Sequence, residues 1–386
     1  MSTEPPLPGA QKALLPNGLN DTLMPDAAIE ADMESRLVAT FAAFGYERVK
    51  PPLAEFEETL TDGPGGAVAP NMFRLMDPVS QRMMGLRPDI TPQIARIATT
   101  RLAKAPRPLR LSYAGPVLQL KGSQLRPERE VTQVGIELIG APTLAADAEV
   151  MVAVAEALAA IGVAQPSFDL SLPRLVPLMC AGMELDAATT ASLRAALDRK
   201  DAGALQALTA LTEERRLTFS TLQRATGTAD AALAALGKLS LPPVAKQHVR
   251  DLGEAVRLVR EQVPGLAMTI DPVEFRGLEY QTGISFTVFA KGVAGELGRG
   301  GRYVLGNGEP ATGATLFMEQ LVQAAGPQER ARLLYLPFGS NAAERRKLHA
   351  AGWRTRAGLE SERDTRAAAK AQGCTHTLSG GQAQPL

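Results

Sequence analysis

Two stretches of the sequence, residues 109–113 and 132–139, alternate between apolar and polar residues. A side-chain period of two is typical of β-strands that bury one face, as strands in antiparallel sheets do. Other stretches repeat apolar residues every three or four positions, as in residues 26–44, which indicates helices with one buried face. Together the two periods predict an α+β fold, with an antiparallel sheet flanked by helices.

The periodicity and the turn residues also predict where most elements lie. We expect a glycine- and proline-rich mobile loop over residues 62–70 and two short strands within residues 72–87, with a turn near Asp77. The expected helices cover residues 26–44, 91–104, 149–161, 312–325, 342–351 and 364–372. The other expected strands cover residues 46–50, 109–113, 132–139, 267–271 with further sheet to about 303, 333–337, and a last strand near 375.

A change in composition near Met183 predicts an insertion. Residues 184–262 are rich in Ala, Leu, Arg and Glu and have a helical period throughout, which indicates three or four helices. We therefore expect residues 1–183 and 263–326 to form the two parts of one core. Residues 327–386 alternate short strands and helices, which predicts a small α/β appendage at the C-terminal end.

Charge and composition disfavour several classes of protein. Lys and Arg number 41 and Asp and Glu also 41, so the chain lacks the net basic charge common in nucleic-acid-binding proteins, and we expect no nucleic-acid partner. Residues 1–10 do not resemble a signal peptide, and apolar runs are too short for a membrane span, which favours a cytoplasmic protein without a membrane partner. Two separate cysteines and three scattered histidines predict neither a metal site nor a cofactor.

Three segments carry polar residues that could bind a ligand. Within residues 132–139, Gln133, Gly135 and Glu137 share one face of the strand, and the glycine leaves space above it. On this pattern alone we favour the simpler interpretation, a solvated sheet face. Residues 275–283 and 297–303 place arginines between glycines, which suits carboxylate or phosphate binding, but each is equally typical of a tight hairpin with a structural arginine.

Five short motifs in order give the chain a resemblance to the histidyl-tRNA synthetase family, a class II synthetase fold, over about residues 12–325. They are Leu-Arg-Pro-Asp-Ile-Thr at 86–91, Tyr-Ala-Gly-Pro-Val-Leu-Gln at 113–119, Thr-Gln-Val-Gly-Ile-Glu at 132–137, Arg-Gly-Leu-Glu-Tyr at 276–280 and Gly-Gly-Arg-Tyr at 300–303. The resemblance implies the class II architecture, with an antiparallel sheet flanked by helices.

The resemblance also implies a pocket for L-histidine. Glu55 and Gln133 would lie near the ammonium group, and Glu137 would lie near the imidazole. Arg276 would lie near the carboxylate, because its forked donors suit that group. The remaining pocket residues that the resemblance implies are Tyr280 and Tyr303, which would line the wall. Two departures from the family pattern affect this pocket, Gln281 in place of a second tyrosine and Glu57 in place of a small hydroxyl residue.

Other departures affect ATP binding. The family's phosphate-binding arginines correspond to Gln119 and Gln320, and an acidic residue on the magnesium and adenine side corresponds to Lys121. An uncharged amide does not replace the charge that phosphoryl chemistry needs, so we expect no catalytic residue for amino-acid activation. The tail after Leu333, in which we expect acids and bases roughly to offset each other, is also shorter than an anticodon-binding domain of about 100 residues.

A synthetase body without these features resembles the regulatory subunits of ATP phosphoribosyltransferase, the first enzyme of histidine biosynthesis. Residues 87–96 look most like that group. The resemblance implies a chain that is not itself an enzyme and that mediates feedback inhibition by histidine. The implied partner is a short catalytic subunit, with which the chain forms a hetero-oligomer, in the family a hetero-octamer.

Two other functions remain open at this stage. The chain could be a divergent but active histidyl-tRNA synthetase, which ATP–pyrophosphate exchange would reveal, or a free-standing histidine- or tRNA-sensing protein, which a tRNA gel shift would reveal. We also expect a self-dimer through residues 16–25 and the helix that follows, because the corresponding class II motif builds a dimer interface. The apolar stripe of that helix is equally typical of intramolecular core; its residues are Ile29, Met33, Leu37 and Phe41.

Overall fold

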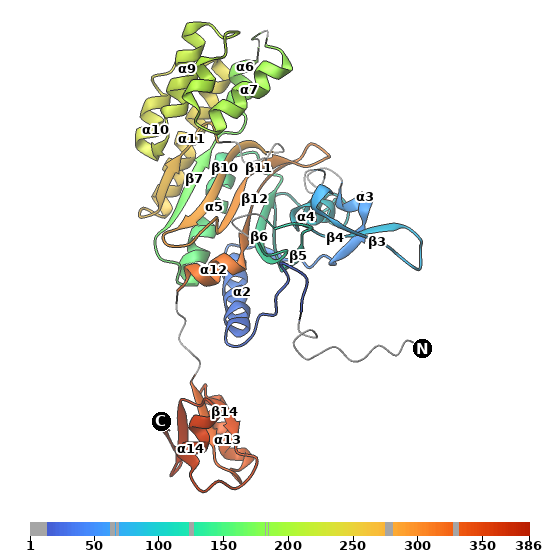
Figure 1. Ribbon diagram of the computed structural model, residues 1–386, viewed down its shortest axis with the longest axis vertical. Helices are drawn as coiled ribbons and strands as arrows, with labels where there is room; N and C mark the ends of the chain where they lie inside the picture. Colours follow the sequence, from blue (N-terminus) through green and yellow to red (C-terminus); the bar gives the residue numbers. More distant parts are fainter. Residues whose placement is uncertain are drawn as a thin grey trace. The chain divides into compact units, whose positions relative to one another are not determined.

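The chain divides into two compact units, Met1–Gly326 and Pro327–Leu386. The computed structural model describes residues 14–61, 66, 69–122, 127–181, 183, 185–274, 281–326 and 332–386. Arg276, Tyr280 and most of the expected loop at 62–70 lie outside the described residues. Figure 1 shows the arrangement of helices and strands within the larger unit.

The larger unit is built on a sheet to which the described residues contribute nine strands. Its centre is antiparallel, while β1 pairs in parallel with β5 at one edge and β7 pairs in parallel with β9 near the other. This mixed sheet flanked by helices confirms the predicted fold class. In spatial order the strands are β1 (Glu47–Arg48), β5 (Leu109–Leu118), β6 (Glu130–Ile139), β12 (Pro310–Phe317), β11 (Gly298–Val304), β10 (Gln281–Ala290), β7 (Pro166–Ser171), β9 (Ala267–Ile270) and β8 (Gly227–Thr228).

The predicted helix at residues 312–325 is wrong in its first half. Residues 310–317 form β12, and helix α12 covers only Met318–Ala324. Strand β12 lies between β11 and β6, and all but its first residue are buried. A strand covered on both faces has no polar alternation, so a short apolar run of this kind is easily mistaken for a buried helix.

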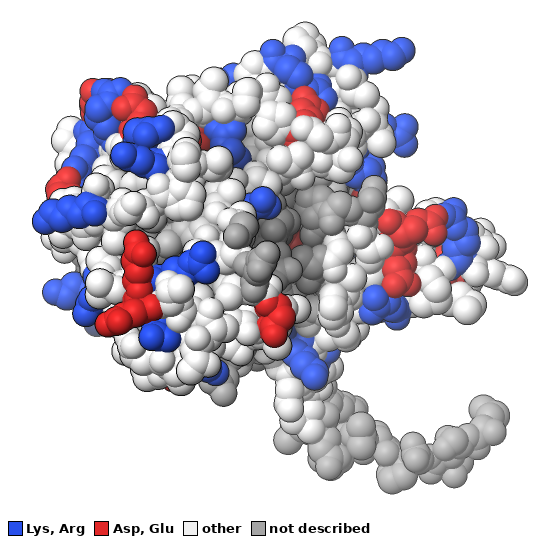
Figure 2. All heavy atoms as spheres, turned by 90° about the horizontal axis from the view of Figure 1, so that it is seen from above, with Lys and Arg blue, Asp and Glu red and all other residues white. Residues whose placement is uncertain are grey.

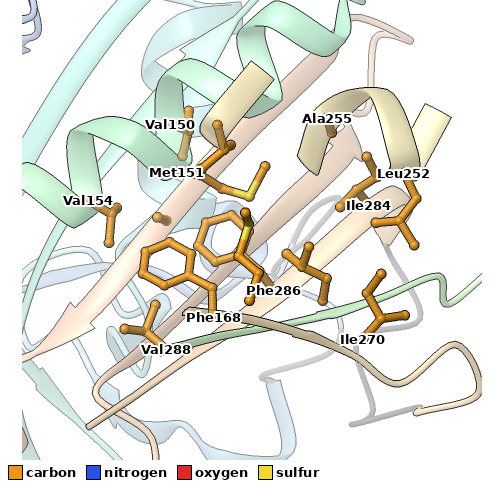
Figure 3. Close-up of a cluster of buried hydrophobic side chains, with 14 of the residues drawn as sticks. Val150, Met151, Val154, Phe168, Leu252, Ala255, Ile270, Ile284, Phe286 and Val288 are labelled. Atoms are coloured by element: carbon orange, nitrogen blue, oxygen red, sulfur yellow. The ribbon is translucent and has the colours of Figure 1, made fainter. Parts of the chain in front are cut away.

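Helices α2 (Asp26–Ala43) and α5 (Leu144–Ala160) cover one face of the sheet, where Val134, Ile136 and Leu138 of β6 are buried. Figure 3 shows α5 side chains beside the stacked rings of Phe168 and Phe286, whose centroids are 5.5 Å apart. The stripe on α2 belongs to this same core. Its buried members are Met33, Leu37 and Phe41, with Ile29 partly buried against them. The intramolecular interpretation of that stripe is therefore confirmed.

On the opposite face, helix α4 (Thr91–Thr99) packs Ile94 and Ala98 against β5 and β6. Helix α4 ends five residues earlier than predicted. Beside it lies a small sheet in the order β2 (Ala54–Phe56), β4 (Met83–Leu86) and β3 (Phe73–Met76), and the single turn α3 (Glu57–Leu60) follows β2 in the chain. The two strands predicted within residues 72–87 are confirmed. The short 3-10 helix η2 (Ala69–Asn71) overlaps the last two residues of the loop predicted at 62–70.

Several boundaries differ from the sequence prediction. Strand β5 extends to Leu118 rather than 113, and α5 begins at Leu144 rather than 149. The sequence prediction began α5 too late because Asp147 is polar, although it lies on the buried face of the helix. Its carboxylate is buried in an ion pair with Arg302. The expected strand at 46–50 is reduced to the two residues of β1.

The structure describes five helices between residues 187 and 262, where three or four were expected. They are α7 (Ala187–Asp198), α8 (Ala202–Gln206), α9 (Glu213–Arg224), α10 (Ala229–Leu236) and α11 (Pro243–Gln262), preceded by α6 (Leu175–Cys180). The side chains of Asp186, Asp201 and Thr212 cap α7, α8 and α9, so these short helices begin at sequence-encoded positions. Figure 1 shows the helices gathered beyond one end of the sheet, and their apolar residues share a single core with it.

The smaller unit, described from residue 332, is a four-stranded sheet in the order β14 (Arg354–Ala357), β13 (Leu333–Leu336), β15 (His376–Ser379) and β16 (Gln382–Pro385). Helices α13 (Ala342–Ala350) and α14 (Thr365–Ala371) connect the parallel strands, as the sequence predicted, whereas β16 was not expected. The expected charge balance of this region is wrong. After Leu333 it contains eight Lys and Arg residues and four Asp and Glu residues.

Three general properties follow from the described residues. None of their helices is both long enough and apolar enough to cross a membrane. Nor does that part of the chain contain a group of three or more His, Cys, Asp or Glu side chains that could hold a metal ion. On the face of the molecule shown in Figure 2, Lys and Arg lie scattered among Asp and Glu rather than in one basic patch.

Candidate functional site

The polar face of β6 is buried, not solvated. Gln133 and Glu137 are each 1% exposed, and the hydroxyl of Tyr113 from β5 lies where a side chain at Gly135 would be. The favoured interpretation of this pattern as a solvated sheet face is therefore wrong. Residues buried on the other face of the strand fix its position, so the amide and the carboxylate are held over the sheet by the core.

Glu137 lies over a floor of glycines. In the sheet register it pairs with Gly313 of β12, which pairs with Gly301 of β11. A Cβ atom at Gly313 would lie 1.8 Å from Oε2 of Glu137, so no other residue fits there without moving the carboxylate. Oε2 also accepts a hydrogen bond of 2.9 Å from the hydroxyl of Tyr303. The register of β6, the absence of a side chain at Gly313 and the hydrogen bond from Tyr303 thus fix the position of the carboxylate.

The electrostatics of Glu137 are unusual for a carboxylate. Burial, assisted by the nearby Asp89, raises the pKa of Glu137 from the ordinary 4.5 to about 8, even though hydrogen bonds from Tyr303 and Thr91 oppose the shift. At neutral pH the unliganded carboxyl is therefore mostly protonated. Such a group favours a ligand that brings positive charge or an N–H donor, because either one stabilises the ionised form.

Gln133 fixes the segment that leads into α4. Its Oε1 accepts from the backbone N–H of Ile90 at 3.0 Å, and its Nε2 donates to Asp89 Oδ2 at 3.2 Å. Asp89 Oδ1 accepts from the backbone N–H of Thr91 at 2.8 Å. These bonds place the Asp89 carboxylate and the Thr91 side chain on the same side of the sheet as Glu137.

These residues line a small, partly open cavity of about 30 Å³, with one arginine, Arg299, in its described lining. Two carboxyl groups, hydroxyls and an arginine around a glycine floor are suitable partners for a cationic or N–H-rich group of a ligand. The lining residues are Asp89, Thr91, Glu137, Gln281, Arg299, Gly300, Gly301, Tyr303, Gly313, Ala314 and Thr315.

The structure does not bring Glu55 to this cavity. Glu55 lies on β2, where its Oε1 accepts from Gln93 Nε2 at 2.8 Å and from Arg96, and its Oε2 accepts from Thr59. Both oxygens are therefore engaged elsewhere. The carboxylate that does line the cavity is that of Asp89, which sequence reasoning missed.

Sequence reasoning missed Asp89 and Thr91, although a motif in the sequence contains both. Both belong to the motif at 86–91, and they flank the start of α4, where a side chain points back over the sheet. Of the expected pocket residues, Gln133, Glu137 and Tyr303 are brought together, while Arg276 and Tyr280 lie outside the described residues. Arg302 does not join them, because its guanidinium is paired with the buried Asp147 at 2.9 Å.

Gln119 and Gln320, which stand where the family has phosphate-binding arginines, differ in their exposure and hydrogen bonds. Gln119 follows β5 and is partly exposed, with its Nε2 3.5 Å from the carbonyl oxygen of Pro88. Gln320 is buried on α12, and within the described residues its Oε1 has no hydrogen-bond donor. Neither supplies a charge, so the chain offers no guanidinium at either position.

The fold and the site define a histidyl-tRNA synthetase-like protein: the family model described as Histidyl-tRNA synthetase matches residues 18–321. The fold also matches a crystal structure of an ATP phosphoribosyltransferase regulatory subunit/histidyl-tRNA synthetase from Bacillus halodurans, with a TM-score of 0.79 and 22% identity over 93% of this chain and 96% of that chain. It further matches an ATP phosphoribosyltransferase complex from Thermotoga maritima, with a TM-score of 0.60 and 16% identity over 75% of this chain and 97% of that chain.

Sequence comparison narrows the class. The chain is 52% identical to the ATP phosphoribosyltransferase regulatory subunit of Rhodospirillum centenum, over 97% of this chain and 96% of that protein. Similar proteins from other bacteria carry the same name. The chain belongs to the family of ATP phosphoribosyltransferase regulatory subunits.

Proposed function

We propose that the chain binds L-histidine in the cavity around Glu137 and transmits feedback inhibition to a separate catalytic subunit. The observation that carries the proposal is the buried Glu137, mostly protonated at neutral pH and facing a cavity that also contains Asp89 and Arg299. Histidine has an ammonium for Asp89, an N–H-bearing ring for Glu137 and a carboxylate for an arginine. In this proposal Asp89 takes the role that the resemblance assigned to Glu55, and Arg276 and Tyr280 remain expected members of the site.

The proposed partner is the short catalytic subunit of ATP phosphoribosyltransferase, in a hetero-oligomer for which the family suggests an octamer. The similarity to a solved ATP phosphoribosyltransferase complex and the family name support this partner. A self-dimer through residues 16–25 is part of the same proposal. Leu23 and Met24 in that segment are 69% and 86% exposed, which is unusual for large apolar side chains and suits an interface. Light scattering of the purified chain that showed a strict monomer, with and without the partner, would exclude the dimer.

Gly313→Ala tests the histidine site directly. Its Cβ would meet the Glu137 carboxylate, so we expect calorimetric histidine binding to fall by at least tenfold. The matched control is Gly265→Ala, where a Cβ atom would have no neighbour within 4 Å. Thermal melts of both variants report whether the fold survives. Unchanged binding in a folded Gly313→Ala variant would contradict the proposed site.

A second experiment tests regulation. The chain, either wild type or Glu137→Ala, is mixed with the short catalytic subunit, and phosphoribosyl-ATP formation is followed at rising histidine. We expect both mixtures to be active and only the wild type to keep full sensitivity, because inhibition across subunits is a coupling free energy, typically about 1–3 kcal/mol. Equal inhibition of both mixtures would place the regulatory histidine on another surface. ATP–pyrophosphate exchange by the chain alone would instead favour an active synthetase.

A further inference from the structure

The small sheet of β2, β3 and β4 packs one of its faces on the rest of the larger unit. Glu55 of β2 lies on this face, where its carboxylate accepts hydrogen bonds from Gln93 and Arg96 of α4. Gly85 of β4 is the register partner of Glu55, and the side chain of the buried Met72 lies where a side chain at Gly85 would be. Helix α4 and Met72 therefore cover this face.

The opposite face of the small sheet, which we call the outer face, is apolar and remains partly exposed. Side chains alternate between the two faces along each strand, and register partners share a face. The residues of the outer face are Ala54, Phe56, Phe73, Leu75, Met84 and Leu86. None of the six is buried, and none belongs to a hydrophobic cluster of the described residues. A sheet face with only apolar side chains is normally packed against another element, so the outer face indicates an interface.

Two arginines lie over the aromatic rings of the outer face. The guanidinium carbon of Arg82 is 3.6 Å from the centroid of the Phe56 ring. That of Arg129 is 4.9 Å from the centroid of the Phe73 ring. Arginine and aromatic side chains are enriched in protein–protein interfaces. Arg82 is also paired with Glu58, so the pair brings no net charge that would repel a second protein surface.

Arg129 also joins the outer face to the segment proposed for the self-dimer. Its backbone N–H donates to the carbonyl oxygen of Gly18 at 2.7 Å, and its guanidinium donates to the carbonyl oxygen of Asn17 at 3.2 Å. Because the same guanidinium lies over the ring of Phe73, the outer face is continuous with the start of residues 16–25.

Residues 16–25 alone are too few for a stable dimer interface. An interface of standard size takes about 20–30 residues from each partner, and this segment has ten. Residues 54–56 and 73–86 bring the surface into that range. Figure 1 shows the hairpin of β3 and β4 projecting from the larger unit, and its apolar residues Leu75 and Val79 are 41% and 90% exposed.

We propose that the outer face binds the same face of a second copy of this chain and forms the larger part of a dimer interface that continues into residues 16–25. This inference rests on the self-dimer proposed above and names the surface that carries most of it. A closed twofold dimer buries the same patch on both subunits, so the patch must be complementary to itself. Apolar side chains meet this condition, because their burial is favourable without a partner of opposite charge.

The first test places a charge on the outer face. The self-association of Leu75→Asp is compared with that of the wild type by light scattering of the full chain over a range of concentrations. We expect the dissociation constant of the dimer to rise by at least about a hundredfold, because the substitution occurs twice in a twofold dimer. The matched control is Leu217→Asp, at an exposed leucine of α9, which should change that constant by less than about threefold. Thermal melts establish that both variants are folded.

The second test needs no variant. Hydrogen peroxide oxidises accessible methionine side chains, and mass spectrometry of peptides locates the product. Met84 lies on the outer face, so we expect its oxidation to be at least about threefold slower in the concentrated dimer than in the diluted monomer. Met72 is 1% exposed within one chain and gives the rate of a covered methionine at both concentrations. Equal rates for Met84 in dimer and monomer would contradict the proposal.

The outcomes separate this inference from the self-dimer on which it rests. If the wild-type chain is a monomer at all concentrations, the proposed self-dimer fails and this inference fails with it. If Leu23→Asp dissociates the dimer but a folded Leu75→Asp variant does not, residues 16–25 form the interface and the role of the outer face is refuted. If Leu75→Asp stays dimeric but no longer binds the short catalytic subunit, the outer face binds that subunit, which also overturns the proposal.

Discussion

Glu137→Gln removes an ionisable group from the centre of the sheet at almost constant shape, and its effect on stability should depend on pH. Glu137 is 1% exposed, and burial raises its pKa from the ordinary 4.5 to about 8. Between these two values the folded chain keeps a proton on this carboxyl that the unfolded chain has released. The contribution of Glu137 to stability is therefore fully present below pH 4.5 and is lost as pH rises towards 8.

The magnitude follows from the separation of the two pKa values. Each unit corresponds to about 1.4 kcal/mol, so ionising Glu137 in the folded chain costs up to about 5 kcal/mol above pH 8. The glutamine variant has no such loss. Its free energy of unfolding should rise relative to the wild type by about 1.4 kcal/mol per pH unit within the window and should level off above it.

Urea unfolding of both proteins at several pH values between about 5 and 9 measures this difference. The comparison also removes the effect of Glu319, whose pKa burial raises to about 7, because that carboxyl is present in both proteins. Glu319 lies at the start of α12, where its Oε1 accepts from the backbone N–H of Thr132 at 2.8 Å. A difference between wild type and variant that stays constant across the pH range would refute the claim that Glu137 is protonated in the folded chain.

Three further perturbations test the packing around the site. Arg302→Met leaves the buried Asp147 carboxylate without its ion-pair partner and should lower the free energy of unfolding by about 3–5 kcal/mol. The control Arg260→Met removes an exposed ion pair with Asp230 and should change the free energy of unfolding by less than about 1 kcal/mol. Equal effects of the two variants in denaturation would contradict the burial of the Arg302–Asp147 pair. Phe286→Ala removes one ring of the stacked pair with Phe168 and should cost about 3–5 kcal/mol in the same assay; a loss under about 1 kcal/mol would contradict that packing. A chain ending at Gly326 should melt within a few degrees of the full chain, because the larger unit holds its own core, and a melt lowered by about 10 °C or more would show that it does not.

The sequence predicted the elements whose patterns are local. The alternation in residues 132–139 identified β6 and the correct division of its two faces, because one face packs on α2 and α5. The helix of residues 26–44 and the two strands within 72–87 were found from periodicity and turn residues. Strand β12 was mistaken for a helix because it lies between β11 and β6 within the sheet and is buried almost throughout, so it lacks polar alternation, and β6 is distant in the sequence.

Prediction of the candidate site was also limited by contacts between segments that are distant in the sequence. Whether the polar face of β6 is solvated or buried depends on α4, on Tyr113 and on the glycine floor from β11 and β12, which the strand's own residues do not reveal. Glu55 was assigned to the ammonium end by resemblance, yet its oxygens bind Gln93 and Arg96 within the small sheet. Asp89 was available in a quoted motif, but only its hydrogen bond to Gln133 places it beside the cavity.

The positions of Gln119 and Gln320 explain how the family's phosphate-binding arginines can be absent while the surroundings of Glu137 are kept. Gln119 follows the end of β5 and Gln320 lies on α12, outside the paired strands. Glu137, by contrast, stands in the middle of β6 between two strands that hold it in register. Substitutions at strand ends therefore leave the glycine floor and the buried carboxylate undisturbed. In the function proposed above, the free energy of histidine binding at this site can act on another subunit only if that subunit's contacts differ between the two states.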